Sequence, residues 1–333
     1  MSINLKNFVE EIEIKDLKNE LNNINSYLYP NLDSAKILYQ QAYLGKSKFK
    51  NISFKINYLK HTVICPLTIE NEGNNNNLNF YGKPFSIFSK FDLEDSISNK
   101  IIDIFLELLN NFKIEKFSFV QEVKNNSLDD YLLKNKSKFE SVFEDSIIDL
   151  SLSEKKIING FSKGHKSSIQ KLYPELNYEI IDFNNYSKNQ IFEMMNLHIK
   201  VVGKRTRSLA TWQENEKMIL QKKGFLIFVK LKNEIISSSL YTHDFNTGTY
   251  FSSCSLRNYF GQYRNLTHFS IVYAIKYLQK INCKYFNVGT VRNLYSREKL
   301  SEKETNVYKF KRSFGGKRVI KVLFDKIPNT LLN

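Results

Sequence analysis

The pattern of hydrophobic and polar positions is clearest in the second half of the chain, where it changes from strand spacing to helix spacing. Residues 224–255 contain three segments rich in β-branched and aromatic residues, separated by short polar turns, which predicts an antiparallel meander. Residues 266–280 carry apolar side chains at helical spacing on two sides, so they are predicted to form a helix buried between layers. A short strand is predicted at 284–288, and a second, basic strand at 308–316.

The first half shows a similar order of elements. Strict alternation of apolar and polar residues predicts a hairpin over 52–69. An amphipathic helix is predicted at 96–112 and the next strand at 116–121. The asparagine-rich tract 72–77 is predicted to be a loop. Each half therefore runs from a meander or hairpin to a helix and then to a strand, which favours a structural duplication.

Length and charge divide the chain in the same way. Its 333 residues, 42% of them hydrophobic, are enough for two domains, which we place at 1–150 and 151–333. The first has 18 basic against 21 acidic residues, a net charge of −3, and the second has 31 against 13, a net charge of +18. A lysine-rich genome explains part of the total of +15, but it does not explain an excess confined to one half. The second domain is therefore expected to bind polyanions or phosphorylated ligands.

Cysteines and apolar runs exclude several other classes of protein. Cys65, Cys254 and Cys283 are scattered and form no CxxC pair, so we predict reduced core residues and no zinc site. The longest apolar run, 225–229, is far shorter than the roughly 20 residues of a membrane span. The first residues show no basic start followed by an apolar stretch, so no secretory signal is predicted. We expect a cytoplasmic protein without a transmembrane segment, whose membrane contact, if any, is peripheral.

This succession of elements resembles the acyl-CoA N-acyltransferase (GNAT) superfamily and, more narrowly, its Fem-type branch. That branch contains the FemAB-like aminoacyltransferases and related acyltransferases of cell-envelope synthesis. The resemblance rests on the 267–280 helix, on Tyr285-Phe-Asn-Val-Gly289, on Phe310-Lys-x-x-Phe314-Gly-Gly, and on a basic helix that begins at Phe161-Ser-Lys-Gly-His-Lys. It implies an α/β fold of two tandem GNAT-like units, each a mixed, mainly antiparallel sheet flanked by helices. The second, basic unit would then hold the active site.

The resemblance also implies where an activated carrier would bind. In the GNAT architecture the acyl group lies where two parallel strands separate, here the strands ending near 253–255 and at 284–289. Acyl-CoA members have a glycine-rich turn before the following helix, but this chain has only Gly261 there, with arginines on both sides. That departure favours a carrier held by side-chain cations. The residues predicted to bind the carrier or its phosphates are Arg257, Arg264, Thr267, Lys166 and Arg312.

Candidate catalytic and substrate residues follow from the same motifs. By resemblance, the Phe-Lys-x-x-Phe motif places Lys311 in the reactive cleft, where it would neutralise a carrier phosphate or a transition-state oxyanion. Tyr241 and His243 are the other catalytic candidates, although a core tyrosine and a surface histidine are the simpler interpretations. His268, at a helix start, is a further candidate base. The substrate cleft is predicted to contain Tyr250, Asn287, Gly289, Arg205 and Arg207.

Three functions remain open from the sequence. The first is transfer of an acyl or aminoacyl group from an activated carrier, with aminoacyl-tRNA favoured, to an amine of a phosphorylated cell-envelope or surface-polysaccharide precursor. The second is acyl-CoA-dependent N-acyl transfer to a nucleotide-linked amino sugar. The third is a catalytically inactive GNAT-like fold that binds RNA or a protein partner. In the first two, the donor is a co-substrate, and no metal and no tightly bound cofactor are expected.

Overall fold

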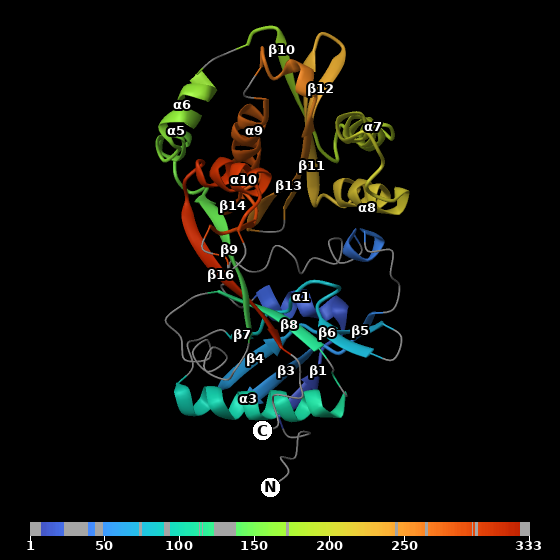
Figure 1. Cartoon of the computed structure of the whole chain (residues 1–333), viewed down its shortest axis with the longest axis vertical. Helices are drawn as coiled ribbons and strands as arrows, with labels where there is room; N and C mark the ends of the chain where they lie inside the picture. The colour runs from blue at the N-terminus through green and yellow to red at the C-terminus, as the bar shows by residue number, and fades with distance from the viewer. Residues whose placement is uncertain are drawn as a thin grey trace. The chain divides into compact units, whose positions relative to one another are not determined.

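The structure of this chain is a computed structural model (Figure 1). It describes residues 8–22, 39–43, 49–72, 75–89, 94–112, 114, 116–122, 138–170, 173–243, 246–263, 266–294, 296 and 299–326.

The chain forms two compact units, and neither is continuous in sequence. Unit 1 contains Met1–Phe143, Arg292–Leu300 and Val319–Asn333, and unit 2 contains Glu144–Val291 and Ser301–Arg318. The division into domains at residue 150 stays a prediction. The compact units differ from it because the C-terminal segment from Val319 belongs with the N-terminal half.

Unit 2 is built on a six-stranded run of sheet in the order β10-β11-β12-β13-β14-β9. The strands are β10 (Leu176–Ile181), β11 (Gly224–Leu231), β12 (Glu234–His243), β13 (Thr247–Ser255), β14 (Tyr285–Asn287) and β9 (Lys138–Asp149), whose first residues belong to unit 1. The pairings β11–β12 and β12–β13 are antiparallel, which confirms the predicted meander. β14 is the exception, because it runs parallel to β13.

Helices cover both faces of this sheet (Figure 1). On one face lie α7 (Gln190–Val202) and α8 (Leu209–Leu220). On the other face lies α9 (Leu266–Lys280), which confirms the predicted buried helix. Near it are α5 (Glu154–Asn159), α6 (Lys163–Gln170) and a single 3-10 turn, η3 (Arg257–Tyr259).

The parallel pair β13–β14 is short, and its two strands separate. Its register joins Thr247 to Tyr285 and Thr249 to Asn287, after which β14 ends while β13 continues to Ser255. Just beyond the last pair, the β12–β13 register shifts between Leu240 and Tyr241, which leaves an extra residue in β13. The two strands predicted to separate are therefore neighbours in one sheet, as expected from the resemblance.

The segment after β14 differs from its prediction. Residues 308–316 were predicted to be a basic strand, but the structure has a helix, α10 (Glu302–Arg312), followed by a tight turn. A capping box begins this helix: Ser301 Oγ accepts from the Glu304 N–H, and Glu304 Oε2 accepts from the Ser301 N–H. Alternating aromatic and basic residues suggested a strand, yet this cap and the acidic first turn specify a helix.

Unit 1 contains a four-stranded sheet in the order β1-β3-β4-β7. The strands are β1 (Val9–Glu11), β3 (Phe54–Tyr58), β4 (His61–Cys65) and β7 (Phe88–Ser89), and α1 (Ile14–Asn22) follows β1. β3 and β4 form the predicted hairpin. The helix α3 (Asp95–Asn111) confirms the predicted amphipathic helix and packs Phe105 against Phe54 of β3.

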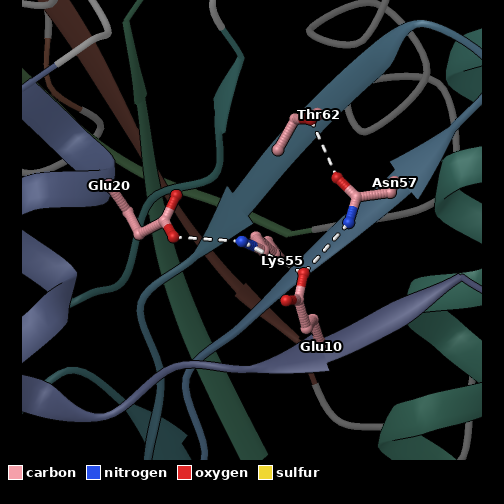
Figure 2. A network of polar contacts seen from close by, with 5 residues as sticks. All are labelled: Glu10, Glu20, Lys55, Asn57 and Thr62. Carbon is pink, nitrogen blue, oxygen red and sulfur yellow. Dashed lines mark hydrogen bonds and ion pairs between the residues drawn. The ribbon is translucent and has the colours of Figure 1, made fainter.

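A polar network links these elements of unit 1 (Figure 2). Lys55 Nζ of β3 lies 3.0 Å from Glu20 Oε1 of α1 and 3.0 Å from Glu10 Oε2 of β1. Asn57 Nδ2 donates to the same Glu10 oxygen, and Thr62 Oγ1 of β4 donates to Asn57 Oδ1. The bond to Glu20 contributes most to a raised pKa of Lys55. The network therefore ties the N-terminal strand and helix to the hairpin.

The remaining strands of unit 1 follow the order β16-β8-β6-β5-β2. They are β16 (Lys317–Lys326), whose first two residues belong to unit 2, β8 (Lys116–Glu122), β6 (Asn75–Asn79), β5 (Thr68–Glu72) and β2 (Phe49–Asn51). β8 confirms the strand predicted at 116–121. The loop predicted at 72–77 is wrong, because Asn76 and Asn77 pair with Asn71 and Glu70 in an antiparallel ladder. Cross-strand pairing overrides the low strand propensity of asparagine.

No helix among the described residues is both long enough and apolar enough to span a membrane. The three cysteines are buried and free of disulfides, as predicted.

Candidate active site

Lys311 lies where β13 and β14 separate. It is half-buried in the last turn of α10, and its Nζ donates a hydrogen bond of 3.3 Å to the main-chain oxygen of Thr290. The same Nζ lies 5.8 Å from the centre of the Tyr250 ring of β13. Burial lowers the pKa of Lys311 to about 8, although the Asp145 carboxylate acts in the opposite direction. Lys311 is thus a desolvated ammonium group at neutral pH.

Gly289 leaves room for this amine. Its φ of +102° is a conformation that L side chains rarely adopt, and a Cβ there would lie 2.6 Å from Lys311 Nζ. The glycine at the end of the predicted strand therefore allows the lysine to approach the main chain directly.

Asn287 and Asp145 form a buried pair beneath Gly289. Asn287 Nδ2 donates to Asp145 Oδ2 at 3.0 Å, and Asn287 Oδ1 accepts from the Gly289 N–H at 2.7 Å. Asp145 is fully buried, and Asn287 is 3% exposed. Asp145 was not predicted from the sequence. The antiparallel pairing of Ile147 with Asn287 brings it here, and this pairing of segments some 140 residues apart leaves no local signal.

Tyr250 and Tyr241 lie on the α9 face of the sheet, with ring centroids 5.6 Å apart. The Tyr250 hydroxyl is hydrogen-bonded to Ser253, and burial raises the pKa of Tyr250 to about 12. Tyr241 is fully buried, its hydroxyl lies 2.8 Å from Ser270 Oγ, and burial raises its pKa well above the usual value. Tyr250 therefore borders the Lys311 amine, whereas Tyr241 is buried in the core beside Tyr250, and its predicted catalytic role stays a prediction.

His243 and Arg312 also have contacts of their own. His243 ends β12; its N–H donates to the Lys223 oxygen, and its ring lies 6.3 Å from Phe225. Arg312 is exposed, and its Nη1 donates to the Tyr308 hydroxyl at 2.9 Å. These contacts do not place either side chain on the Lys311 amine, so their predicted roles stay predictions.

The predicted phosphate-binding residues are spread over unit 2. Arg207 is held on the α7–α8 face, because its Nη2 donates to Ser252 Oγ at 3.1 Å and its guanidinium lies 5.3 Å from the Trp212 ring. Ser252 pairs with Leu240, whereas Tyr250 pairs with Tyr241 of the opposite face, so Arg207 and Lys311 lie on different sides of the sheet.

The other predicted phosphate-binding and cleft residues have fewer described contacts. Arg205 and Arg257 are exposed, and Thr267 is half-buried in the first turn of α9. Lys166 of α6 donates to the Asn159 oxygen at 3.4 Å. Arg264 lies outside the described residues. The structure thus brings together Lys311, Tyr250, Asn287 and Gly289, and the phosphate-binding roles predicted for the other residues stay predictions.

The Phe-Gly-Gly turn after α10 has a packing role. A Cβ on Gly315 would lie 2.4 Å from the Gly160 oxygen, and a Cβ on Gly316 would lie 2.5 Å from the Ile147 oxygen. Phe314 is buried edge-on against Phe161. These two glycines therefore allow close main-chain contact within unit 2.

Two histidines pack against the Lys311 helix. The rings of His165 on α6 and His268 on α9 lie 4.3 Å apart, and both contact Phe310 and Phe314. His165 Nε2 lies 3.1 Å from the Phe310 oxygen. Burial, with a smaller contribution from His165, lowers the pKa of His268 to about 4. His268 is therefore neutral at pH 7, and its Nδ1 is buried with no hydrogen-bond partner among the described residues.

We expect His268→Phe to make the protein less sensitive to acid. In the wild type, the unfolded state binds the His268 proton below its usual pKa of 6.5, while the folded state resists it until about pH 4, so stability is lost as the pH falls through this range. The loss attributable to this residue at pH 5 is about 1 to 2 kcal/mol. Urea unfolding at pH 7 and pH 5 measures it. His61→Phe, at the start of β4, is the matched control, and an unchanged pH dependence of His268→Phe would contradict the assignment.

Comparison with known proteins supports the fold. No protein-family model and no curated protein matches the sequence. The chain is similar in structure to FemX, with a TM-score of 0.67 and 12% identity over 97% of this chain and 98% of FemX. It is also similar to the C-terminal domain of a putative lysylphosphatidylglycerol synthetase from Agrobacterium fabrum, with a TM-score of 0.53 and 10% identity over 96% and 94% of the two chains.

A third similar structure is a tandem GNAT protein from the clavulanic acid biosynthesis pathway. Its TM-score is 0.51, with 7% identity over 95% of this chain and 97% of the other. At such identities the comparisons show the fold alone. The predicted fold, a mixed α/β structure of the tandem GNAT and FemAB-like kind, is confirmed over nearly the whole chain.

Proposed function

We propose that this chain, which has the fold of FemX and of a tandem GNAT protein, transfers an acyl or aminoacyl group from an activated carrier to an amine. The proposal favours aminoacyl-tRNA as the donor and a phosphorylated cell-envelope precursor as the acceptor. The observation that carries it is the half-buried Lys311 amine at the point where β13 and β14 separate. An amine in such a position is suited to stabilise charge that develops on a carrier's carbonyl oxygen.

The chemistry assigns Lys311 one step. The acceptor amine attacks the carbonyl carbon of the carrier ester, the carbonyl oxygen becomes negative, and the Lys311 ammonium donates a hydrogen bond to it. When the intermediate collapses, the amide bond has formed, the ester bond breaks, and the carrier hydroxyl leaves with the proton lost by the amine. The Gly289 N–H is already bonded to Asn287, so it is not available as the donor that GNAT folds take from the strand. Lys311 supplies that donor instead.

The donor preference rests on charge and on the turn before α9. Residues 151–333 carry a net charge of +18, which suits a polyanionic carrier. The turn has one glycine, Gly261, and the η3 segment carries the exposed Arg257. The match to a putative lysylphosphatidylglycerol synthetase, a name that implies aminoacyl transfer, favours the same donor.

Radiolabelled donors test this function. The full chain is incubated with mixed aminoacyl-tRNAs or with acetyl-CoA, in each case with an extract of envelope precursors. We expect label from aminoacyl-tRNA to enter a product that survives mild base, because an amide resists conditions that hydrolyse the donor ester. If label enters the product only from acetyl-CoA, the donor is an acyl-CoA and not aminoacyl-tRNA. Transfer from neither would overturn the enzyme assignment and favour an inactive fold, for which RNA binding should weaken steeply with salt.

A further inference from the structure

Asn287 was predicted to line the substrate cleft, but its amide is directed into the protein. Its Oδ1 accepts from the Gly289 N–H at 2.7 Å, and its Nδ2 donates to Asp145 Oδ2 at 3.0 Å. Both polar atoms are therefore engaged, and the side chain is 3% exposed. A side-chain amide carries an acceptor oxygen beside an N–H donor, so asparagine suits a position that must bond both the Gly289 N–H and the Asp145 carboxylate.

The hydrogen bonds of Asn287 connect to Lys311 through the main chain of Gly289 and Thr290. Gly289, fixed by Asn287, has a φ of +102°, and the next residue, Thr290, presents the carbonyl that accepts from Lys311 Nζ at 3.3 Å. The amine also lies close to Gly289 itself, because a Cβ there would be 2.6 Å from Nζ. The position of the amine thus depends on the conformation at the end of β14.

We propose that Asn287 is a positioning residue that joins the buried Asp145 carboxylate to the end of β14 and thereby holds the Lys311 amine in place. This inference rests on the proposed function, in which that amine donates to the carbonyl oxygen of the carrier. Asp145 has a second role, because its negative charge favours the ammonium form of Lys311. Asn287 thus acts through the main chain and does not touch the substrate.

The charged and titratable groups described near the amine come from β9, α10 and β13. On β9, Asp145 acts on Lys311 directly, while Glu144 Oε2 lies 3.5 Å from the Tyr308 hydroxyl. On α10, Arg312 donates to Tyr308. On β13, Tyr250 presents its ring, and its pKa of about 12 keeps it neutral. Of these groups, Asp145 is the one charge that acts on the Lys311 pKa.

Competitive labelling of lysines measures this arrangement without any substrate. The full chain is treated with trace acetic anhydride from pH 6 to 11, and acetylation of Lys311 is quantified by peptide mass spectrometry against the exposed Lys309 of the same helix. In Asp145→Asn the new amide still accepts from Asn287, so only the charge is lost, and the half-labelling pH of Lys311 should fall by about one unit. In Asn287→Ala the strand end is released and the amine reaches water, so the half-labelling pH should rise by about one unit or more.

Two further variants keep the test decisive. Asn287→Ser keeps a small polar group but is too short to bridge Asp145 and the Gly289 N–H, so it too should raise the half-labelling pH, and it replaces the alanine variant if that one fails to fold. Asn185→Ala is the matched control: Asn185 Oδ1 accepts from the Asp182 N–H and its Nδ2 donates to the Ile180 oxygen, both at 2.8 Å. It should lower the melting temperature without changing the labelling of Lys311.

The outcomes distinguish a role of Asn287 in positioning the Lys311 amine from a role in stability alone. Opposite shifts in Asp145→Asn and the Asn287 variants, with none in Asn185→Ala, support the proposal. If the Asn287 variants keep the wild-type half-labelling pH, or if Asn185→Ala shifts it equally, the proposal is overturned. Since labelling needs no donor and no acceptor, a protein that transfers nothing can still show the shifts, so failure of the proposed function is seen separately.

Discussion

Replacement of Lys311 with methionine should reduce transfer by about 10²- to 10³-fold, the typical loss when one oxyanion donor is removed. The same change should raise the melting temperature at neutral pH. Methionine fills a volume similar to that of the lysine stem but does not require burial of an ammonium group. Single-turnover transfer from the labelled donor measures the first effect, and thermal unfolding the second.

The direction of the stability change follows from the pKa. The Lys311 pKa is about 8 in the folded protein, against an ordinary value of 10.5, so the folded state disfavours the proton that the unfolded state binds. The destabilisation caused by burying the Lys311 ammonium group is fully present below about pH 8 and disappears as the pH rises towards 10.5. The advantage of Lys311→Met should therefore be largest at about pH 7 and small at about pH 10.

Lys309→Met is the control, because Lys309 is exposed on the same helix. It should leave both transfer and the melting temperature close to those of the wild type. Equal activity of Lys311→Met and the wild type would remove Lys311 from the proposed mechanism. Unchanged activity with a raised melting temperature would leave Lys311 as a buried lysine without a catalytic role.

The pattern of apolar residues predicted most of unit 2 because its elements are local and strongly periodic. The meander of β11 to β13 and the helix α9 occupy nearly the predicted residues. Short polar turns and two-sided apolar periodicity are properties of consecutive residues, so no tertiary information is needed to recognise them.

The two wrong element predictions arose where strand pairing or a helix cap outweighed the composition and the periodicity of the segment. The asparagine tract pairs as β5–β6 despite its composition. The segment before Phe314 forms α10 because Ser301 and Glu304 cap it, although its aromatic and basic residues alternate. In both segments the intrinsic preference of the residues contributed less than the strand pairing or the helix cap.

The candidate site was predicted in part for the same reason. Lys311 and Gly289 were found through short motifs, and the structure joins them through the Thr290 carbonyl. Asp145 was not found, because it reaches Asn287 only through the β9–β14 pairing. Arg207 was predicted to share the cleft with Tyr250. Its partner Ser252 follows the extra residue in β13 and therefore lies on the opposite face of the sheet from Tyr250.

Gly316→Ala should destabilise unit 2 strongly, because two costs combine at this position. Its φ of +83° disfavours any side chain, and a Cβ would lie 2.5 Å from the Ile147 oxygen and 2.8 Å from the Ile147 carbonyl carbon. Those atoms are main chain of β9, so they cannot rotate away. We expect a loss of about 2–4 kcal/mol in the free energy of unfolding, as is typical of an incompatible substitution at positive φ with overpacking.

Gly203→Ala separates the conformational cost of a side chain at positive φ from the cost of the close contact. Gly203 has nearly the same φ, +82°, but a Cβ there would meet nothing within 4 Å, so only the conformational cost of about 1 kcal/mol applies. Urea unfolding of both variants gives the difference, which is the cost of the contact between the α10 turn and β9. Because this turn follows Lys311 directly, loosening it should also raise the half-labelling pH of Lys311 in Gly316→Ala but not in Gly203→Ala. Equal losses of stability in the two variants would show that the close approach to Ile147 does not hold the Lys311 helix in place.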